Sequence, residues 1–108
     1  MKEEEMEREA LKVKRMLESK DYQTSLRKAV VRNLVGEEKI GFSIVASKGE
    51  HVIRWRVLDG RFEVDITLKG EVDEEVAEVK GYHVEKDGEY YKLFKRSKKP
   101  FDFSSEVP

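Results

Sequence analysis

The sequence lacks cysteine, and it lacks any apolar run long enough to cross a bilayer as a helix. Without cysteine there is neither a disulfide nor thiolate chemistry. The first residues, MKEEEMEREALK, are too charged for a signal peptide. These absences predict a cytoplasmic protein that does not contact a membrane.

Recognisable catalytic motifs are also missing. The sequence contains no Gly-rich phosphate loop, no nucleophile elbow and no HExxH motif. Its two histidines, His51 and His83, lie far apart in the chain, whereas a zinc site needs about four ligands at suitable spacing. We therefore expect a protein that is not an enzyme and that holds no cofactor and no metal.

Charge is abundant but balanced. Charged residues make up 42% of the 108 residues, yet 22 basic residues face 23 acidic ones and the formal net charge is −1. Disorder usually needs a large net charge, so this composition indicates a folded domain with many surface ion pairs, as in proteins of hyperthermophiles. We expect one domain over residues 1–99, followed by an irregular tail over 100–108.

The N-terminal segment has helical periodicity. Over residues 2–19, Met6, Ala10, Val13 and Leu17 recur at helical spacing and form one narrow apolar stripe. Such a stripe packs either on its own domain or on a second copy of the chain.

Residues 24–35, TSLRKAVVRNLV, predict a second helix. Thr24 or Ser25 is a suitable N-cap, and Gly36 is a suitable residue to end the helix in the left-handed conformation. Leu26, Val30 and Leu34 would face the core. The pair of β-branched valines at 30 and 31 also fits a strand, so that alternative stays open.

From residue 38 to residue 69 the apolar period becomes two, which predicts three strands in an antiparallel meander. Lys48-Gly49 and Asp59-Gly60 are plausible two-residue turns. The first turn would pair Ile44 with Ile53, and the second would pair Trp55 with Val64. Both turns place Trp55 on the buried face.

The second turn also sets the neighbours of Trp55. It places Arg54 opposite Asp65 and Arg56 opposite Glu63, on the outer face of the sheet. Facing opposite charges stabilise a sheet by roughly 0.2–1 kcal/mol per pair. We interpret these arginines mainly as members of a cross-strand ladder rather than as ligand contacts.

The last third of the chain predicts a short helix and a hairpin. Asp73 would cap the helix, with Val72, Val76 and Val79 facing inward. Asp87-Gly88 would then form a tight turn that pairs Val84 with Tyr91. The predicted fold class is α+β: two N-terminal helices, a three-stranded antiparallel meander, a short helix, a C-terminal β-hairpin and an irregular tail.

Apolar residues at both ends of the chain predict a protein-interaction or self-assembly module. The expected interaction residues are Met6, Val13, Leu17, Phe101 and Phe103. Phe101 and Phe103 would lie on one side of an extended tail and cover either the sheet of their own domain or a partner. The partner would be another protein or a second copy in a two-fold homodimer.

A basic and aromatic surface on the last hairpin supports an alternative function, the binding of nucleic acid. Its candidate residues are Tyr90, Lys92, Phe94, Lys95 and Arg96. Cations between aromatic rings on a sheet suit single-stranded nucleic acid. In the competing interpretation the N-terminal helix covers Tyr90 and Phe94.

Acidic residues cluster as well, at Glu71, Asp73, Glu74, Glu75 and Glu78. The chain is therefore an uneven dipole, which favours the steering of a charged partner or a head-to-tail contact between copies.

Overall fold

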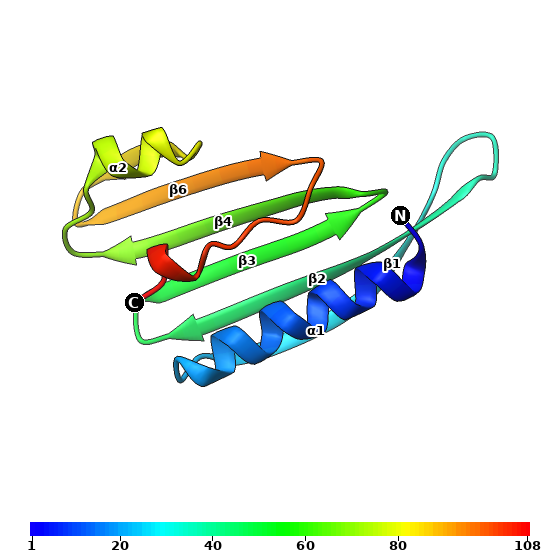
Figure 1. The fold of residues 1–108 in the computed structure, drawn as a ribbon, viewed down its shortest axis with the longest axis horizontal. Helices are drawn as coiled ribbons and strands as arrows, with labels where there is room; N and C mark the ends of the chain where they lie inside the picture. Colours follow the sequence, from blue (N-terminus) through cyan, green and yellow to red (C-terminus); the bar gives the residue numbers. More distant parts are fainter.

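A computed structural model describes all residues from 1 to 108 and shows one antiparallel sheet with helices and a tail packed on it (Figure 1). The elements in chain order are α1 (Glu3–Ser19), β1 (Gln23–Arg32), β2 (Glu38–Lys48), β3 (His51–Leu58), β4 (Arg61–Lys69), α2 (Glu74–Val79), β5 (His83–Asp87), β6 (Tyr90–Ser97) and the 3-10 turn η1 (Ser104–Glu106).

The predicted fold class was wrong in two respects. The segment that was expected to form the second helix is strand β1, and the C-terminal hairpin joins the meander instead of standing apart. The result is a single α+β domain with one N-terminal helix and a six-stranded sheet in the order β1-β2-β3-β4-β6-β5.

β1 is a strand because it pairs with β2 along its whole length, from Gln23 opposite Ser47 to Arg32 opposite Glu38. Its β-branched residues favour this extended state. Gly36, with a φ of +82°, turns the chain between the two strands rather than ending a helix.

The turn at Asp59-Gly60 was predicted correctly. Both residues have positive φ, as a type I′ turn requires, and Trp55 lies opposite Val64. The predicted positions of Arg54 opposite Asp65 and of Arg56 opposite Glu63 are confirmed, but only Arg56 and Glu63 form an ion pair.

The other two hairpin registers were wrong by two residues. Ile44 lies opposite Trp55, and Val84 lies opposite Leu93. In these hairpins the glycines, Gly49 and Gly88, occupy the first turn position, where type II′ turns need a positive φ, rather than the second. A shift of two residues keeps every side chain on its predicted face.

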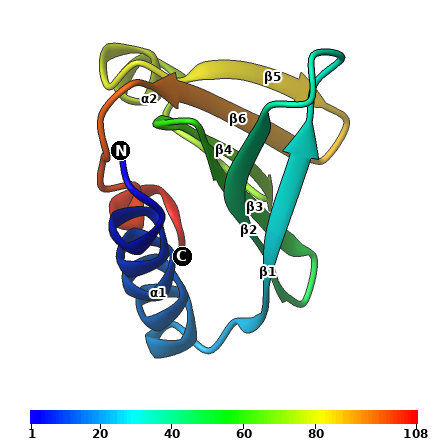
Figure 2. The ribbon, with the colours of Figure 1, turned by 90° about the vertical axis from the view of Figure 1, so that its right-hand side faces the viewer.

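The core lies on one face of the sheet. β2, β3 and β4 bury alternate residues there, among them Ile44, Trp55 and Ile66. Figure 2 shows that α1, α2 and the C-terminal tail all lie on this same side. The opposite face has no helix over it.

α1 uses its predicted stripe inside its own domain. Met6, Ala10 and Leu17 are buried against the sheet, and Val13 is partly buried at the edge of the same cluster. Most of the stripe is therefore covered by the domain itself.

α2 is capped as predicted, because the Val76 amide donates to Asp73 Oδ1 at 3.2 Å. Its buried residue, however, is Ala77. The expectation that Val76 and Val79 face inward was wrong, since the side chains of both are exposed. A helix of six residues that buries one side chain covers little apolar surface.

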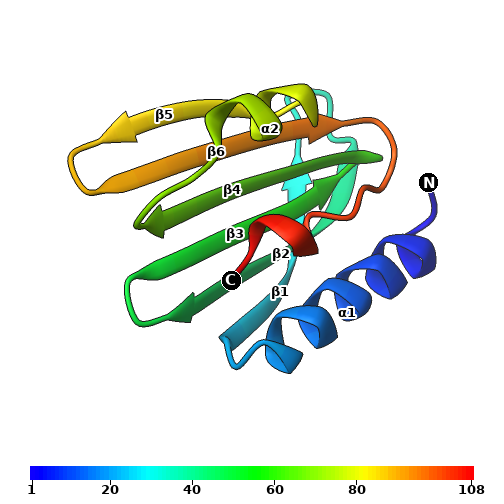
Figure 3. The same ribbon diagram turned by 60° about the vertical axis from the view of Figure 1, so that its left-hand side comes forward.

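The tail completes the core between α1 and α2 (Figure 3). Phe103 and Val107 are buried, and Phe101 packs edge-on against Phe103 with 6.4 Å between ring centroids. The tail thus covers the sheet of its own domain.

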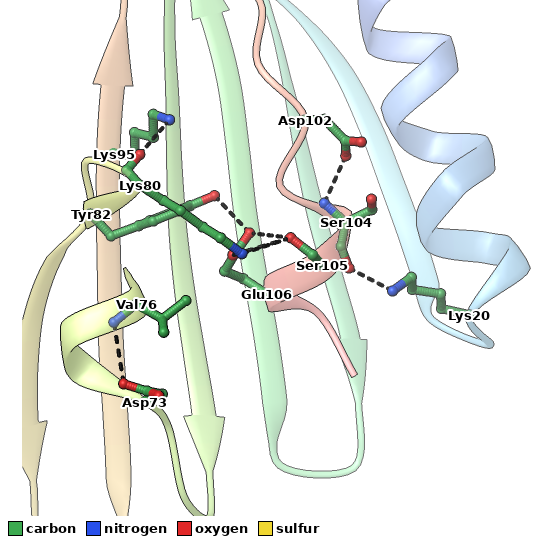
Figure 4. A network of polar contacts seen from close by, with 10 residues as sticks. All are labelled: Lys20, Asp73, Val76, Lys80, Tyr82, Lys95, Asp102, Ser104, Ser105 and Glu106. Carbon is green, nitrogen blue, oxygen red and sulfur yellow. Dashed lines mark hydrogen bonds and ion pairs between the residues drawn. The ribbon is translucent and has the colours of Figure 1, made fainter. Parts of the chain in front are cut away.

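Polar contacts hold the tail in place (Figure 4). The Lys20 ammonium donates to the carbonyls of Ser104 and Val107, each at 2.6 Å. The Glu106 carboxylate accepts from Lys80 at 2.7 Å and from the Tyr82 hydroxyl at 3.2 Å. Burial, together with the charge of Glu106, raises the pKa of the Tyr82 phenol, so this hydroxyl stays a donor.

The buried tail predicts a strong dependence of stability on Phe103. Phe103→Ala leaves a cavity in the core and should lower the free energy of unfolding by about 3–5 kcal/mol. Denaturant unfolding followed by circular dichroism measures this loss. Phe101→Ala, at a partly buried ring, is the matched control and should cost clearly less. Equal small losses for both variants would show that the tail is not part of the core.

Candidate nucleic-acid interface

The candidate site is the open face of the sheet, which is the face opposite to α1, α2 and the tail. Facing residues of neighbouring antiparallel strands share one side of a sheet. The open face therefore contains Arg54 and Arg56 of β3 together with their partners Asp65 and Glu63. No helix covers these side chains (Figure 2).

Basic side chains outnumber acidic ones on the strands of this face. The basic residues are Arg27, Lys39, Arg54, Arg56, Arg61, Lys69, Lys92 and Arg96, and the acidic residues are Glu63, Asp65, Glu85 and Asp87. Eight positive charges less four negative ones leave +4 on this face, although the chain as a whole carries −1.

Turn residues neutralise part of this charge at the periphery of the sheet. Asp59 pairs with Lys39 at 2.9 Å, and Glu50 pairs with Lys69 at 2.9 Å. Glu89 is a second acidic neighbour, with a carboxylate oxygen 3.6 Å from the Lys69 ammonium. The excess of positive charge that remains is concentrated in the middle of the face.

An arginine row crosses the middle of the open face. The strand registers align Arg27 of β1, Ser43 of β2, Arg56 of β3, Glu63 of β4 and Arg96 of β6 side by side. At about 4.8 Å per strand the row spans about 19 Å. It contains three guanidinium groups and one carboxylate.

Glu63 bridges two of the three arginines. One carboxylate oxygen binds Arg56, and the other lies 2.8 Å from Nε of Arg96. The Glu63 side chain is only 13% exposed, whereas those of Arg56 and Arg96 are 59% and 58% exposed. Because one acid orients two bases, the trio keeps a net positive charge and holds both guanidinium groups near fixed positions.

Three further arginines on the face have no acidic partner within ion-pair distance: Arg61 beside the Asp59-Gly60 turn, and Arg27 and Arg54. Arg27 forms no ion pair, and neither does Arg54, even though it faces Asp65 across the strands. Their guanidinium groups are free to bind an external anion, and planar guanidinium suits bidentate contacts with phosphate.

One aromatic ring on β6, that of Phe94, adjoins the arginine row. The Arg96 guanidinium lies 5.7 Å from the Phe94 ring centroid, within the range of a cation–π contact. His83, on the neighbouring strand β5, lies directly opposite Phe94 on the same face of the sheet. The Phe94 ring is partly exposed and can therefore stack against a planar ligand.

Tyr90 lies at the end of the same strand and is held by its hydroxyl. This group donates to Glu50 Oε1 at 2.9 Å. Lys69 and, after it, Tyr90 hold the pKa of the Glu50 carboxyl below its usual range. The same hydrogen bond raises the pKa of the Tyr90 phenol.

The structure brings together four of the five predicted nucleic-acid residues. Tyr90, Lys92, Phe94 and Arg96 share the open face. Lys95 points to the other side, where its ammonium lies 4.8 Å from the Phe101 ring centroid and donates to the Lys80 carbonyl at 2.8 Å. Lys95 thus contacts the tail and does not contribute to the open face.

The expected protein-interaction residues lie on the helix side. Met6, Leu17 and Phe103 are buried. Val13 and Phe101 line a groove of about 320 Å³ between α1 and the tail, together with Met16. These partly exposed side chains are all that remains accessible of the predicted apolar surface.

Arg27 was missed by the sequence analysis because its segment was assigned to a helix. Once β1 is a strand, its register aligns Arg27 with Arg56. The sequence offered only a partial signal for this strand, the β-branched pair Val30 and Val31, which also fits an extended segment.

Comparisons of this chain with protein-family models, with curated proteins and with solved structures find no match. No cluster of three or more His, Cys, Asp or Glu side chains is arranged to hold a metal ion. No helix has both the length and the apolarity to span a bilayer.

Loss of the Tyr90 hydroxyl should change the titration of Glu50. Tyr90→Phe removes a donor to the ionised carboxylate, so the pKa of Glu50 should rise toward its ordinary value. A lowered carboxyl pKa stabilises the folded state above the ordinary pKa, and this contribution is lost as the pH falls through the lowered value. The variant should therefore lose less stability on acidification than the wild type does.

Carbon-detected NMR titration of the Glu50 carboxyl measures this shift. Tyr91→Phe is the matched control, because Tyr91 lies on the other face beside Lys86. An unchanged Glu50 midpoint in Tyr90→Phe would refute the hydrogen bond in solution.

Proposed function

We propose that this protein is a non-catalytic module that binds single-stranded nucleic acid on the open face of its sheet. The observation that carries the proposal is the arginine row beside Phe94 on a face that no helix covers. Guanidinium groups bind phosphates, and a partly exposed ring such as that of Phe94 can stack on bases of any sequence.

A single strand suits this face better than a duplex does. Unpaired bases are free to turn toward Phe94 and His83, which bases inside a duplex cannot do. No helix projects from this face to enter a major groove (Figure 2). The strand would lie across the sheet and follow the arginine row from β1 to β6.

The expected affinity is modest and depends on salt. Arg27, Arg54, Arg56 and Arg96 are the four central bases, and Glu63 offsets one of them. Three to four phosphate contacts on a single strand give a slope of about −2 to −3 in a plot of log K against log salt, at ~0.7 per contact. Broad coating of duplex DNA is not expected from a chain with a net charge of −1.

The arginines without an acidic partner offer the sharpest test. Arg27→Ala with Arg54→Ala removes two phosphate contacts and breaks no ion pair. Binding of a fluorescent twelve-residue oligouridylate or oligothymidylate, followed by anisotropy at several salt concentrations, should weaken, and its salt slope should fall by about 1.4. The matched control is Arg8→Ala with Arg15→Ala, which makes the same charge change at exposed positions of α1.

Two outcomes of these measurements would contradict the proposal. Undetectable binding of both oligonucleotides by the wild-type protein at low salt would do so. Equal losses in the two double variants would show that the open face has no special role.

Stacking on Phe94 predicts a separate effect. Phe94→Ala should weaken oligonucleotide binding by about 1–3 kcal/mol while leaving the salt slope unchanged, because stacking releases no counterion. The same anisotropy titration measures it. Binding by Phe94→Ala that equals the wild type would remove stacking from the proposal and leave a purely electrostatic surface.

A further inference from the structure

A second row of side chains crosses the open face beside the arginine row. The strand registers align Val45 of β2, Arg54 of β3, Asp65 of β4, Phe94 of β6 and His83 of β5, a set that we call the Phe94 row. It lies two residues along each strand from the arginine row, so the two rows are about 6.8 Å apart. A ligand that contacts one row is therefore within reach of the other.

Among the four acids on the strands of the open face, only Asp65 has a side chain without a partner. The other three, Glu63, Glu85 and Asp87, each contact a basic side chain. The exposed Asp65 carboxylate forms neither an ion pair nor a hydrogen bond, although Arg54 lies directly opposite it. A free carboxylate repels phosphate groups, so it weakens the binding of a nucleic-acid backbone unless it contacts another part of the ligand.

Asp65 lies beside the ring that is proposed to stack on a base. Asp65 and Phe94 occupy directly facing positions of β4 and β6, where Cβ atoms are about 4.5–5.5 Å apart. Arg96 contacts the same ring, with 5.7 Å between its guanidinium group and the ring centroid. A purine base is wider than the phenyl ring beneath it, so the edge of a base stacked on Phe94 reaches toward the Asp65 carboxylate.

A hollow next to Asp65 joins the two rows. It has a volume of about 210 Å³, and its lining includes Ser43, Arg54, Arg56 and Asp65. The two guanidinium groups and the hydroxyl group supply hydrogen-bond donors there. The hollow thus leaves room for the sugar and phosphate of a nucleotide whose base lies over Phe94 and Asp65.

The Asp65 carboxylate distinguishes bases by the donors on their edges. An ionised carboxylate only accepts hydrogen bonds, and it offers two oxygens side by side. Guanine alone among the bases presents two adjacent N–H donors on its Watson–Crick edge, at N1 and at the 2-amino group. Adenine and cytosine place one amino group beside an acceptor nitrogen, and uracil and thymine place one N–H between two carbonyl oxygens, which the carboxylate repels. The Watson–Crick edge is free for such a contact only in an unpaired strand.

We propose that Asp65 makes the open face selective for guanine. The base stacks on Phe94, its N1–H and its 2-amino group donate to the two oxygens of Asp65, and its phosphate binds the arginine row. A good bidentate pair discriminates by about 5- to 150-fold against the wrong base. This inference rests on the proposed function and adds a base preference to it.

Oligouridylates of twelve residues that differ only at one central base test this preference on the wild-type protein. The central base is guanine, adenine or hypoxanthine. Adenine is the matched control for stacking because it is also a purine, and hypoxanthine keeps N1–H but lacks the 2-amino group. Anisotropy titrations at low salt should give about tenfold tighter binding with guanine than with adenine, and an intermediate affinity with hypoxanthine.

Asp65→Asn then assigns the preference to one side chain. Its amide offers one acceptor and one donor, a pattern that suits adenine, so the ratio of guanine to adenine affinity should fall to about one or below. Binding of the all-uridine strand should not weaken, because the variant removes a negative charge from the face. Asp87→Asn, at another exposed acid of this face, is the matched control and should keep the preference for guanine. Both positions are exposed, so circular dichroism should show both variants folded.

Several outcomes would overturn this inference and leave the proposed function intact. One is measurable binding of all strands by the wild type with a preference for guanine over adenine below about fivefold. Others are equal binding of guanine and hypoxanthine, an unchanged preference in Asp65→Asn, and loss of the preference in Asp87→Asn. Undetectable binding of every strand would instead end the proposed function, and the base preference with it.

Guanosine monophosphate as a competitor distinguishes a base within a strand from a free nucleotide. A single nucleotide reaches few of the arginines on the face, so it should displace the guanine-containing strand only at a large excess. Displacement at a concentration equal to that of the strand would assign the site to a free nucleotide and overturn the proposal.

Discussion

The whole structure depends on the burial of alternate side chains along β2, β3 and β4. Ile44, Ile53, Trp55 and Ile66 project from one face into the core. Because the side chains of a strand alternate, burying one face necessarily presents the other to solvent. α1, α2 and the tail all pack on the apolar face. The arginines therefore lie on the open face, which no helix covers.

The periodicity of the chain allowed the central hairpin to be predicted down to its residue pairs. The turn at Asp59-Gly60 has only one good register, since a slip by one residue would expose Trp55 and Val64. The two-residue errors at the other hairpins arose because glycine suits either position of a tight turn, in different turn types. Those errors preserved the alternation, which is why Tyr90, Phe94 and Arg96 were correctly placed on one face.

Local sequence patterns could not decide whether the segment of β1 forms a helix or a strand. Leu26, Val30 and Leu34 are spaced by four residues, a spacing that fits the turn of a helix and also places all three on one side of a strand. Only the availability of an unpaired edge of β2 decides between the two, and that is a property of the tertiary structure. The tail could not be placed for a similar reason, because Phe103 occupies a space that exists only after α1 and the sheet have packed.

The contacts of Lys20 with the tail have a consequence for the order in which the chain folds. This residue follows α1 directly, yet its ammonium binds carbonyls that lie 84 and 87 positions further along the chain. Contacts between residues so distant in sequence form slowly, because a long loop must close before any bond is gained. The sheet hairpins close over a few residues and can form early. α1 therefore gains its full protection from hydrogen exchange only after the tail has docked, so it is among the last elements to become rigid although it precedes the whole sheet in the sequence.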